Sequence, residues 1–277
     1  MKRKRHRHRH RVYQRGAYLL LLGLLFLSPQ GFASPLNKDL ESSGEYVRKS
    51  FLQKMKLSFS NEGENEGKKK ALIIGDSHAQ DFLNGVLENH FLSNYQISTR
   101  YIPTRCQIYL GNNYSRYLKA EDKQLCESSD NLFLARKQIG EADLIILAAS
   151  WKKWAAEELP QTIKNLHLRP QQKLIVIGRK SFSKSLVDNY QQLPKEDLLQ
   201  MRNRVDEHQD LINKIMSQSL SKDVFVNIHQ IICGDALSCP VFTDKLKLIS
   251  FDGGHFSKNG ARYVTKLLFQ GSQLGAL

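Results

Sequence analysis

Three residues of this chain are of the right types to perform nucleophilic chemistry together. Ser77 stands in "IIGDSHAQ", where an apolar run breaks off at polar residues, and Asp252 and His255 share the glycine turn of "FDGGHFSKNGARYV". A serine hydroxyl becomes a nucleophile when a base takes its proton, and the base needs a carboxylate that fixes its tautomer. We therefore expect Ser77 to be the nucleophile, His255 the base and Asp252 its orienting acid. The competing interpretation is that Asp76 or Ser77 only caps a helix and that the D-x-x-H turn lies on the surface.

The elements that must position these residues alternate between strands and helices. Continuous apolar runs of this length, separated by helix-length spans, indicate parallel strands buried on both faces. We expect helices over about 77–90, from residue 151, and over about 257–269, with a long amphipathic segment over about 194–220. The strand-like runs are "KALIIG", "YQISTRYI", "ADLIILAAS", "KLIVIG" and "DVFVNI". The sequence predicts an α/β fold, a three-layer α/β/α sandwich with a mostly parallel sheet, in which Ser77 lies at a strand's carboxyl end, where ligands collect.

The first residues of the 277-residue chain are typical of an export signal. Eight Lys or Arg and no acid precede the apolar block "AYLLLLGLLFL" of 11 residues, which is shorter than the roughly 20 residues that cross a bilayer. We predict a signal peptide over 1–33, cleaved after Ala33, and a periplasmic or secreted protein. An uncleaved N-terminal membrane anchor is the alternative. Residues 34–69 are expected to form a helical segment and a linker, "NEGENEGKKK", before the main domain at 70–277.

The net charge of +14 falls to +6 once residues 1–33 are removed, because 33 Lys and Arg then stand against 27 Asp and Glu. Most of the support for a nucleic-acid partner is lost with them. An even number of cysteines in an exported chain favours disulfides, with three possible connectivities, of which the local pairs are the simplest. Zinc is the competing reading, but neither pair has C-x-x-C spacing, so we expect no metal site. The cysteines are Cys106, Cys126, Cys233 and Cys239.

The motifs around Ser77 and His255 resemble those of the SGNH/GDSL hydrolase superfamily. More closely, they are similar to the SGNH domain at the periplasmic end of bacterial acyltransferase-3 membrane proteins, which O-acylate surface carbohydrates. That branch shares a cysteine after the second strand ("IPTRCQIYLG"), a strand ending in tryptophan ("LIILAASW") and a cysteine pair before the D-x-x-H. The resemblance covers roughly residues 70 to 270 and implies a flavodoxin-like SGNH fold.

The resemblance also implies an oxyanion hole made of the serine N–H, a glycine N–H and an asparagine side chain. Gly111 in "YLGNN" is the candidate glycine. The asparagine is missing after the third strand, where Ser150 is the nearest polar substitute. Losing one such donor costs about 10²- to 10³-fold in rate. Trp151, and with less support Trp154, are candidates for stacking on a sugar ring, although a tryptophan at a strand end is more often part of the core.

Together these features predict a serine esterase or O-acyltransferase acting on acyl, above all acetyl, esters of a cell-envelope carbohydrate. The partner is an envelope glycan or acylated sugar, no cofactor is needed, and a transferase would require a membrane protein that delivers acyl groups. The alternative, favoured by the missing asparagine, is a catalytically weakened SGNH fold that binds carbohydrate or serves as a scaffold in envelope assembly.

Overall fold

The structure, a computed structural model, describes residues 46–182, 190, 193–250 and 252–277 of the chain. The chain divides into two compact units, Met1–Ala33 and Ser34–Leu277, and every described residue belongs to the second. The signal peptide predicted for residues 1–33 therefore lies outside the described residues. Within the described part of the chain, no helix combines the length and the apolar character needed to cross a membrane.

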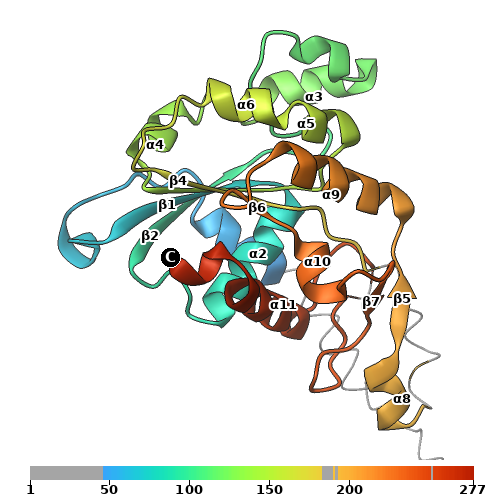
Figure 1. The fold of residues 1–277 in the computed structure, drawn as a ribbon. Coiled ribbons are helices and arrows are strands. Elements are labelled where there is room, and N and C mark those ends of the chain that lie inside the picture. Colours follow the sequence, from blue (N-terminus) through green and yellow to red (C-terminus); the bar gives the residue numbers. More distant parts are fainter. Residues whose placement is uncertain (1–45, 183–189, 191–192, 251) are drawn as a thin grey trace, which may run out of the picture. The chain divides into compact units, whose positions relative to one another are not determined.

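A five-stranded sheet with all neighbours parallel forms the centre of the second unit (Figure 1). Its strand order is β2-β1-β3-β4-β6. Side chains alternate across it: Ala71 and Ile73 point into one apolar cluster, Leu72 and Ile74 into another. Each apolar run predicted as a strand contributes one strand, although "DVFVNI" yields only two residues. The strands are β1 Lys69–Gly75, β2 Tyr95–Tyr101, β3 Leu144–Ala148, β4 Lys173–Ile177 and β6 Phe225–Val226.

Helices pack on both faces of this sheet, which confirms the predicted three-layer α/β/α architecture (Figure 1). One face carries α2 (Ser77–Glu88), α10 (Ile228–Cys233) and α11 (Lys258–Gly271). The other carries α3 (Lys123–Ser128), α4 (Arg136–Glu141), α5 (Lys153–Glu157), α6 (Leu159–Asn165) and α9 (Glu207–Ser219). The short 3₁₀ helices are η1 Gly63–Asn65, η2 Tyr114–Tyr117, η3 Ala120–Asp122 and η4 Gln273–Ala276.

The segment expected to be one long amphipathic stretch over about 194–220 is divided in the structure. It forms α8 (Lys195–Gln200), the short strand β5 (Arg202–Arg204) and then α9. β5 pairs antiparallel with β7 (Ser238–Pro240), the strand that contains Cys239. Because the partner strand is distant in sequence, local periodicity cannot reveal the interruption.

The residues before β1 pack against the sheet. Residues 46–53 are helical, and the fully buried ring of Phe51 belongs to the same apolar cluster as α2 and α11. The Thr99 hydroxyl of β2 donates to the Phe51 carbonyl at 2.7 Å, and Met55 forms a parallel bridge with Thr99. This helical turn therefore extends the core beyond the outer strand β2.

Candidate active site

Ser77 lies at the carboxyl edge of the sheet, where β1 ends and α2 begins. A Cβ on Gly75 would lie 1.8 Å from the carbonyl oxygen of Ala148, so a glycine is required where β1 and β3 end side by side. Asp76 caps α2 by accepting the His78 N–H at 2.9 Å. Ser77 is the first residue of α2, and its own N–H has no acceptor among the residues that the structure describes. That N–H is available at the positive end of the helix dipole.

Asp76 also joins three loops beneath the serine. Its buried carboxylate accepts the Thr104 hydroxyl at 2.7 Å, from the loop after β2. It accepts the Ser150 N–H, from the loop after β3, at 2.9 and 3.1 Å to its two oxygens. Asp76 is therefore a helix cap and a tie between loops at once, and it holds Ser77 in place relative to both neighbouring strands.

The first and last parts of the domain meet at Ser77. The His255 ring places Nε2 2.9 Å from the Ser77 Oγ and Nδ1 2.5 Å from the Asp252 Oδ2, across a sequence separation of 178 residues. The other carboxylate oxygen of Asp252 accepts the backbone N–H groups of Gly254 at 2.8 Å and His255 at 2.7 Å. An ionised carboxylate can only accept, so Nδ1 carries the proton and Nε2 offers its lone pair to the serine hydroxyl. The structure thus brings the three predicted residues together in the expected order.

The protonation of Asp252, His255 and the neighbouring His78 is set by burial and by nearby polar and charged groups. Burial alone raises the pKa of Asp252, but hydrogen bonds from the His255 ring and from the N–H groups of His255 and Gly254 outweigh it and hold the pKa well below its usual range. The hydrogen bond to Asp252 raises the pKa of His255 above its ordinary value of 6.5, against burial and the charge of Lys180. Burial, and then Lys180, depress the pKa of the adjacent His78 far below 6.5, so that ring stays neutral.

Asp252 and His255 are partly open to solvent. The side chains of His255 and Asp252 are 40% and 41% exposed, and Ser77 is half-buried. A site exposed to this degree can receive a group carried on a large molecule, since the reacting atoms do not lie in an enclosed cavity.

Of the three residues predicted for the oxyanion hole, the structure brings Ser77 and Ser150 together but not Gly111. The Ser77 N–H is available, and Ser150 is close, because its N–H binds the carboxylate that precedes Ser77. Gly111 lies elsewhere: the atoms nearest to a Cβ built on it belong to Tyr109, and the preceding Leu110 is hydrogen-bonded to α6 through both its N–H and its carbonyl. The structure therefore does not bring Gly111 to the serine.

Trp151 does not contact solvent, which contradicts its predicted role in stacking on a sugar. It is 0% exposed, and its indole N–H donates to the Ile177 carbonyl at 2.9 Å. The strand-end tryptophan is thus part of the core. Trp154 is half-buried, and its ring stacks on Tyr117 with centroids 4.4 Å apart. Tyr109 meets both rings edge-on.

Sequence reasoning missed two buried charged residues beside the base. Asp81, one turn after Ser77 on α2, forms an ion pair with Lys180 from the loop after β4, at 2.8 Å. The spacing of Asp81 from Ser77 was a usable signal, since it puts an acid on the same helix face as the serine. Nothing in the sequence pairs it with a lysine so distant in the chain.

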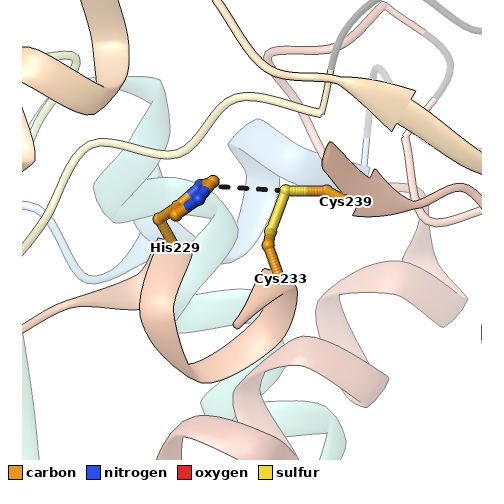
Figure 2. A group of neighbouring side chains, drawn as sticks. All are labelled: His229, Cys233 and Cys239. Carbon is orange, nitrogen blue, oxygen red and sulfur yellow. Dashed lines mark hydrogen bonds between the residues drawn. A yellow bond between two sulfur atoms is a disulfide. The ribbon is translucent and has the colours of Figure 1, made fainter. Parts of the chain in front are cut away.

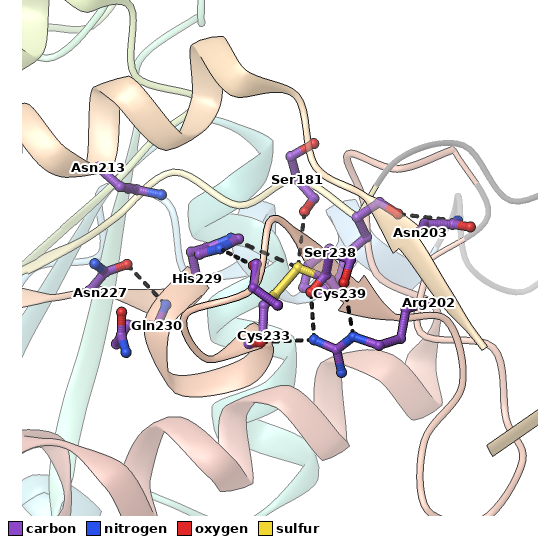
Figure 3. The surroundings of a disulfide bond; sticks show 12 residues. Ser181, Arg202, Asn203, Asn213, Asn227, His229, Gln230, Cys233, Ser238 and Cys239 are labelled. Carbon is purple, nitrogen blue, oxygen red and sulfur yellow. Dashed lines mark hydrogen bonds between the residues drawn. A yellow bond between two sulfur atoms is a disulfide. The ribbon is translucent and has the colours of Figure 1, made fainter. Parts of the chain in front are cut away.

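The four cysteines form the two local disulfides, Cys106–Cys126 and Cys233–Cys239. The second joins α10 to β7, and Arg202 of β5 donates to the Cys233 carbonyl at 2.8 Å (Figure 3). The Cys239 sulfur lies 3.7 Å from the carbonyl oxygen of Ser181. This disulfide therefore packs against the loop that follows β4, the loop that carries Lys180.

One histidine lies against this disulfide. The Nδ1 of His229 is 3.8 Å from the Cys239 sulfur (Figure 2). Its Nε2 is 3.2 Å from the Ala236 carbonyl oxygen. The ligand atoms of His229, Cys233 and Cys239 lie within 4.8 Å of one another, close enough to share a metal ion. Both sulfurs are consumed in the disulfide, however, and offer no thiolate to a metal while it is intact.

Comparison with known proteins gives one family and one fold. A model of the family described as "SGNH domain (fused to AT3 domains)" matches residues 47–270. Among solved structures, the chain is similar to the periplasmic domain of the lipopolysaccharide acetyltransferase of Salmonella ser. Paratyphi A, with a TM-score of 0.56 and 16% identity over 87% of this chain and 97% of that chain. At that identity the likeness shows the fold. No curated protein matches.

Proposed function

Because the chain belongs to the family of SGNH domains of the kind fused to AT3 domains, we propose that it is a serine esterase or O-acyltransferase. Its substrate is an acyl ester, with acetyl the favoured acyl group, of a cell-envelope carbohydrate. The observation that carries the proposal is the continuous hydrogen-bond chain from the Ser77 Oγ through the His255 ring to Asp252.

In the first half-reaction the Ser77 Oγ attacks the ester carbonyl carbon while His255 Nε2 takes the hydroxyl proton. Asp252 stays ionised and stabilises the imidazolium that forms. The C–O bond to the sugar then breaks, and His255 returns the proton to the departing sugar oxygen, which leaves an acyl-enzyme. In the second half-reaction His255 deprotonates water or a sugar hydroxyl, whose oxygen attacks the acyl carbon. The bond between that carbon and the Ser77 Oγ then breaks, His255 returns the proton to Ser77, and the carboxylic acid or the new sugar ester is released. Water makes the protein an esterase, and a sugar hydroxyl makes it a transferase.

The negative charge that develops on the carbonyl oxygen needs donors. The Ser77 N–H, available at the start of α2, is the first of them. The second in this proposal is the hydroxyl of Ser150 in the loop after β3, because the Ser150 N–H is already donated to Asp76. The superfamily's other two oxyanion donors, a glycine N–H and an asparagine side chain, are not supplied by Gly111 or by the loop after β3. A slow hydrolase, or an enzyme that favours transfer, fits this reduced set.

The carbohydrate substrate is supported by two considerations. The related solved domain belongs to a lipopolysaccharide acetyltransferase, and the exposed acid and base of this chain suit a group carried on a large glycan. Export by cleavage after Ala33 to the periplasm or beyond, and a membrane partner that supplies acyl groups, remain parts of the same proposal.

A fluorophosphonate probe tests the chemistry, because it forms a covalent bond only with an activated serine. Labelling of the mature protein is expected, with complete loss in Ser77→Ala. The matched control is Ser128→Ala at the exposed end of α3, where the hydroxyl binds only helix carbonyls; it should label like the wild type. Release of acetate from an acetylated saccharide, with or without an added acceptor sugar, then separates hydrolysis from transfer.

The competing function is a carbohydrate-binding or scaffolding module. The observation in its favour is that the loop after β3 presents Ala149, Ser150 and a buried Trp151 where the superfamily has its asparagine. A folded wild-type sample that resists the probe but binds envelope glycan would support this alternative and end the enzymatic proposal.

A further inference from the structure

The ion pair between Asp81 and Lys180 is almost completely removed from water. The two side chains are 1% and 3% exposed, with Lys180 Nζ 2.8 Å from Asp81 Oδ2. Burying two charges costs free energy that their attraction seldom exceeds by much, and an apolar pair of equal size often stabilises a fold as well. The presence of this pair therefore calls for an explanation other than overall stability.

The contacts of the pair converge on the residues either side of His255. Asp81 Oδ2 accepts the backbone N–H of Phe256 at 3.1 Å. Lys180 Nζ donates to the backbone carbonyl of Gly254, and it also lies 4.8 Å from the centre of the Phe256 ring. One residue before the base and one residue after it are thus fastened to the same pair of charges.

The pair connects α2, the loop after β4 and the turn that carries His255. Asp81 lies on α2, one helical turn from Ser77, so an anchor on Asp81 is an anchor to the helix that carries the nucleophile. Lys180 comes from the loop after β4. Two residues later in that loop, Phe182 donates its N–H to the Gly253 carbonyl at 2.9 Å. The exposed turn that carries Asp252 and His255 is held from below by buried groups.

We propose that Asp81 and Lys180 are positioning residues for the general base: they fix the backbone on both sides of His255 so that its Nε2 meets the Ser77 hydroxyl. This inference rests on the proposed function. A side chain displaced by about 1 Å can lose about 10²-fold in rate. Ser250 also braces the turn, because its hydroxyl donates to the His255 carbonyl at 2.6 Å and accepts the Gly253 N–H at 3.0 Å, whereas the bond from Phe256 to Asp81 ties the turn to the helix that carries Ser77.

The pair also surrounds the base with opposed charges. Lys180 lowers the pKa of His255 and Asp81 raises it, while Asp252 on the same turn raises it most and the neighbouring His78 stays neutral. Replacing one partner alone changes both the position and the charge around the base. Replacing both leaves the balance of charge near the base unchanged and isolates the positioning role.

The decisive variant is therefore the double substitution Asp81→Asn/Lys180→Met, which removes the charges together and leaves no unpaired ion in the core. Its matched control is Asp130→Asn/Arg100→Met, which removes the pair between β2 and the loop before α4, also largely buried at 3.0 Å. Both proteins are compared with the wild type in the rate of fluorophosphonate labelling per folded molecule and in the urea concentration at half-unfolding.

We expect the Asp81→Asn/Lys180→Met protein to label about 10- to 100-fold more slowly than the wild type, while the control labels at the wild-type rate however much stability it loses. A purely structural role predicts that labelling per folded molecule is the same in all three. Equal labelling would overturn the inference. If the double variant does not fold, Asp81→Glu, which keeps the charge of the pair but moves the carboxylate that accepts the Phe256 N–H, should still slow labelling several-fold, and labelling at the wild-type rate would overturn the inference.

A crystal structure of the double variant separates this inference from the proposed function. The distance between Ser77 Oγ and His255 Nε2 should lengthen beyond hydrogen-bonding range, and an unchanged distance would refute the positioning role. If the wild type is not labelled at all, the proposed function fails, and this distance decides the role of the pair by itself.

Discussion

Asp76→Asn tests whether one buried carboxylate holds the carboxyl edge of the sheet together. Asp76 is the N-cap of α2, and asparagine caps a helix as well as aspartate does. Capping alone therefore predicts almost no loss of stability. The carboxylate does more than cap, because it also receives the Thr104 hydroxyl and the Ser150 N–H.

The magnitude follows from the geometry of these bonds. If the amide oxygen of asparagine replaces Oδ1, the amide NH₂ faces the Ser150 N–H where Oδ2 accepted it at 2.9 Å. If it replaces Oδ2, the NH₂ faces the His78 N–H where Oδ1 accepted it at 2.9 Å. Either orientation sets donor against donor in a buried site and removes a charge from the remaining bonds. With hydrogen bonds to charged groups worth about 1.5 to 3 kcal/mol, we expect a loss of about 2 to 4 kcal/mol.

The assay is urea unfolding with both disulfides intact, followed by tryptophan fluorescence. Asp206→Asn is the matched control, because Asp206 caps α9 through a single exposed bond to the His208 N–H at 2.9 Å. That variant should change the free energy of unfolding by less than about 0.5 kcal/mol. If Asp76→Asn loses no more than Asp206→Asn, the carboxylate is only a cap and the account of the joined loops is wrong.

Three further outcomes follow from the site. Hydrolysis of an activated acetyl ester, measured as kcat/KM, should rise with pH through an apparent pKa above 6.5, because the hydrogen bond to Asp252 raises the pKa of His255 and only the neutral ring accepts a proton; a midpoint below 6.5 contradicts this. Asp252→Asn should lower the labelling rate by about 10⁴-fold, since it disfavours the tautomer with the proton on Nδ1, and a loss under tenfold would deny Asp252 its orienting role. In Gly85→Ala a Cβ would stand 1.9 Å from the Thr265 hydroxyl of α11, so α2 and α11 must separate; the free energy of unfolding should fall by about 1 to 3 kcal/mol and labelling should slow. The control Gly140→Ala, which has open space around it, should raise the free energy of unfolding by up to about 1 kcal/mol. Equal effects of the two substitutions would show that the contact between the helices is not tight.

The contact among Ser77, His255 and Asp252 could be predicted because each residue stands in a short motif whose geometry depends mainly on neighbouring residues. A glycine, a cap and a serine at the end of an apolar run fix Ser77 at a helix start, and the two glycines between Asp252 and His255 allow one turn to bring carboxylate and ring together. The parallel sheet followed from continuous apolar runs for the same reason, since burial on both faces leaves no polar alternation.

The features that sequence reasoning placed wrongly or missed depend on tertiary packing, which sets the direction of a side chain or the path of a loop. Trp151 ends a strand, and only the position of β4 decides that its indole turns inward to the Ile177 carbonyl. Gly111 lies in a loop whose path is set by hydrogen bonds to α6. The pairing of Asp81 with Lys180 requires α2 and the loop after β4 to meet, which no spacing within either segment encodes.

The hydrogen bond between Ser77 and His255 has a consequence for synthesis, because its two partners lie 178 residues apart. A growing polypeptide contains the hydroxyl long before the ribosome adds the imidazole, and α11 must still dock on α2 to seat it. Under the proposed function, His255 therefore cannot activate Ser77 until the last part of the chain has been synthesised and has folded against α2.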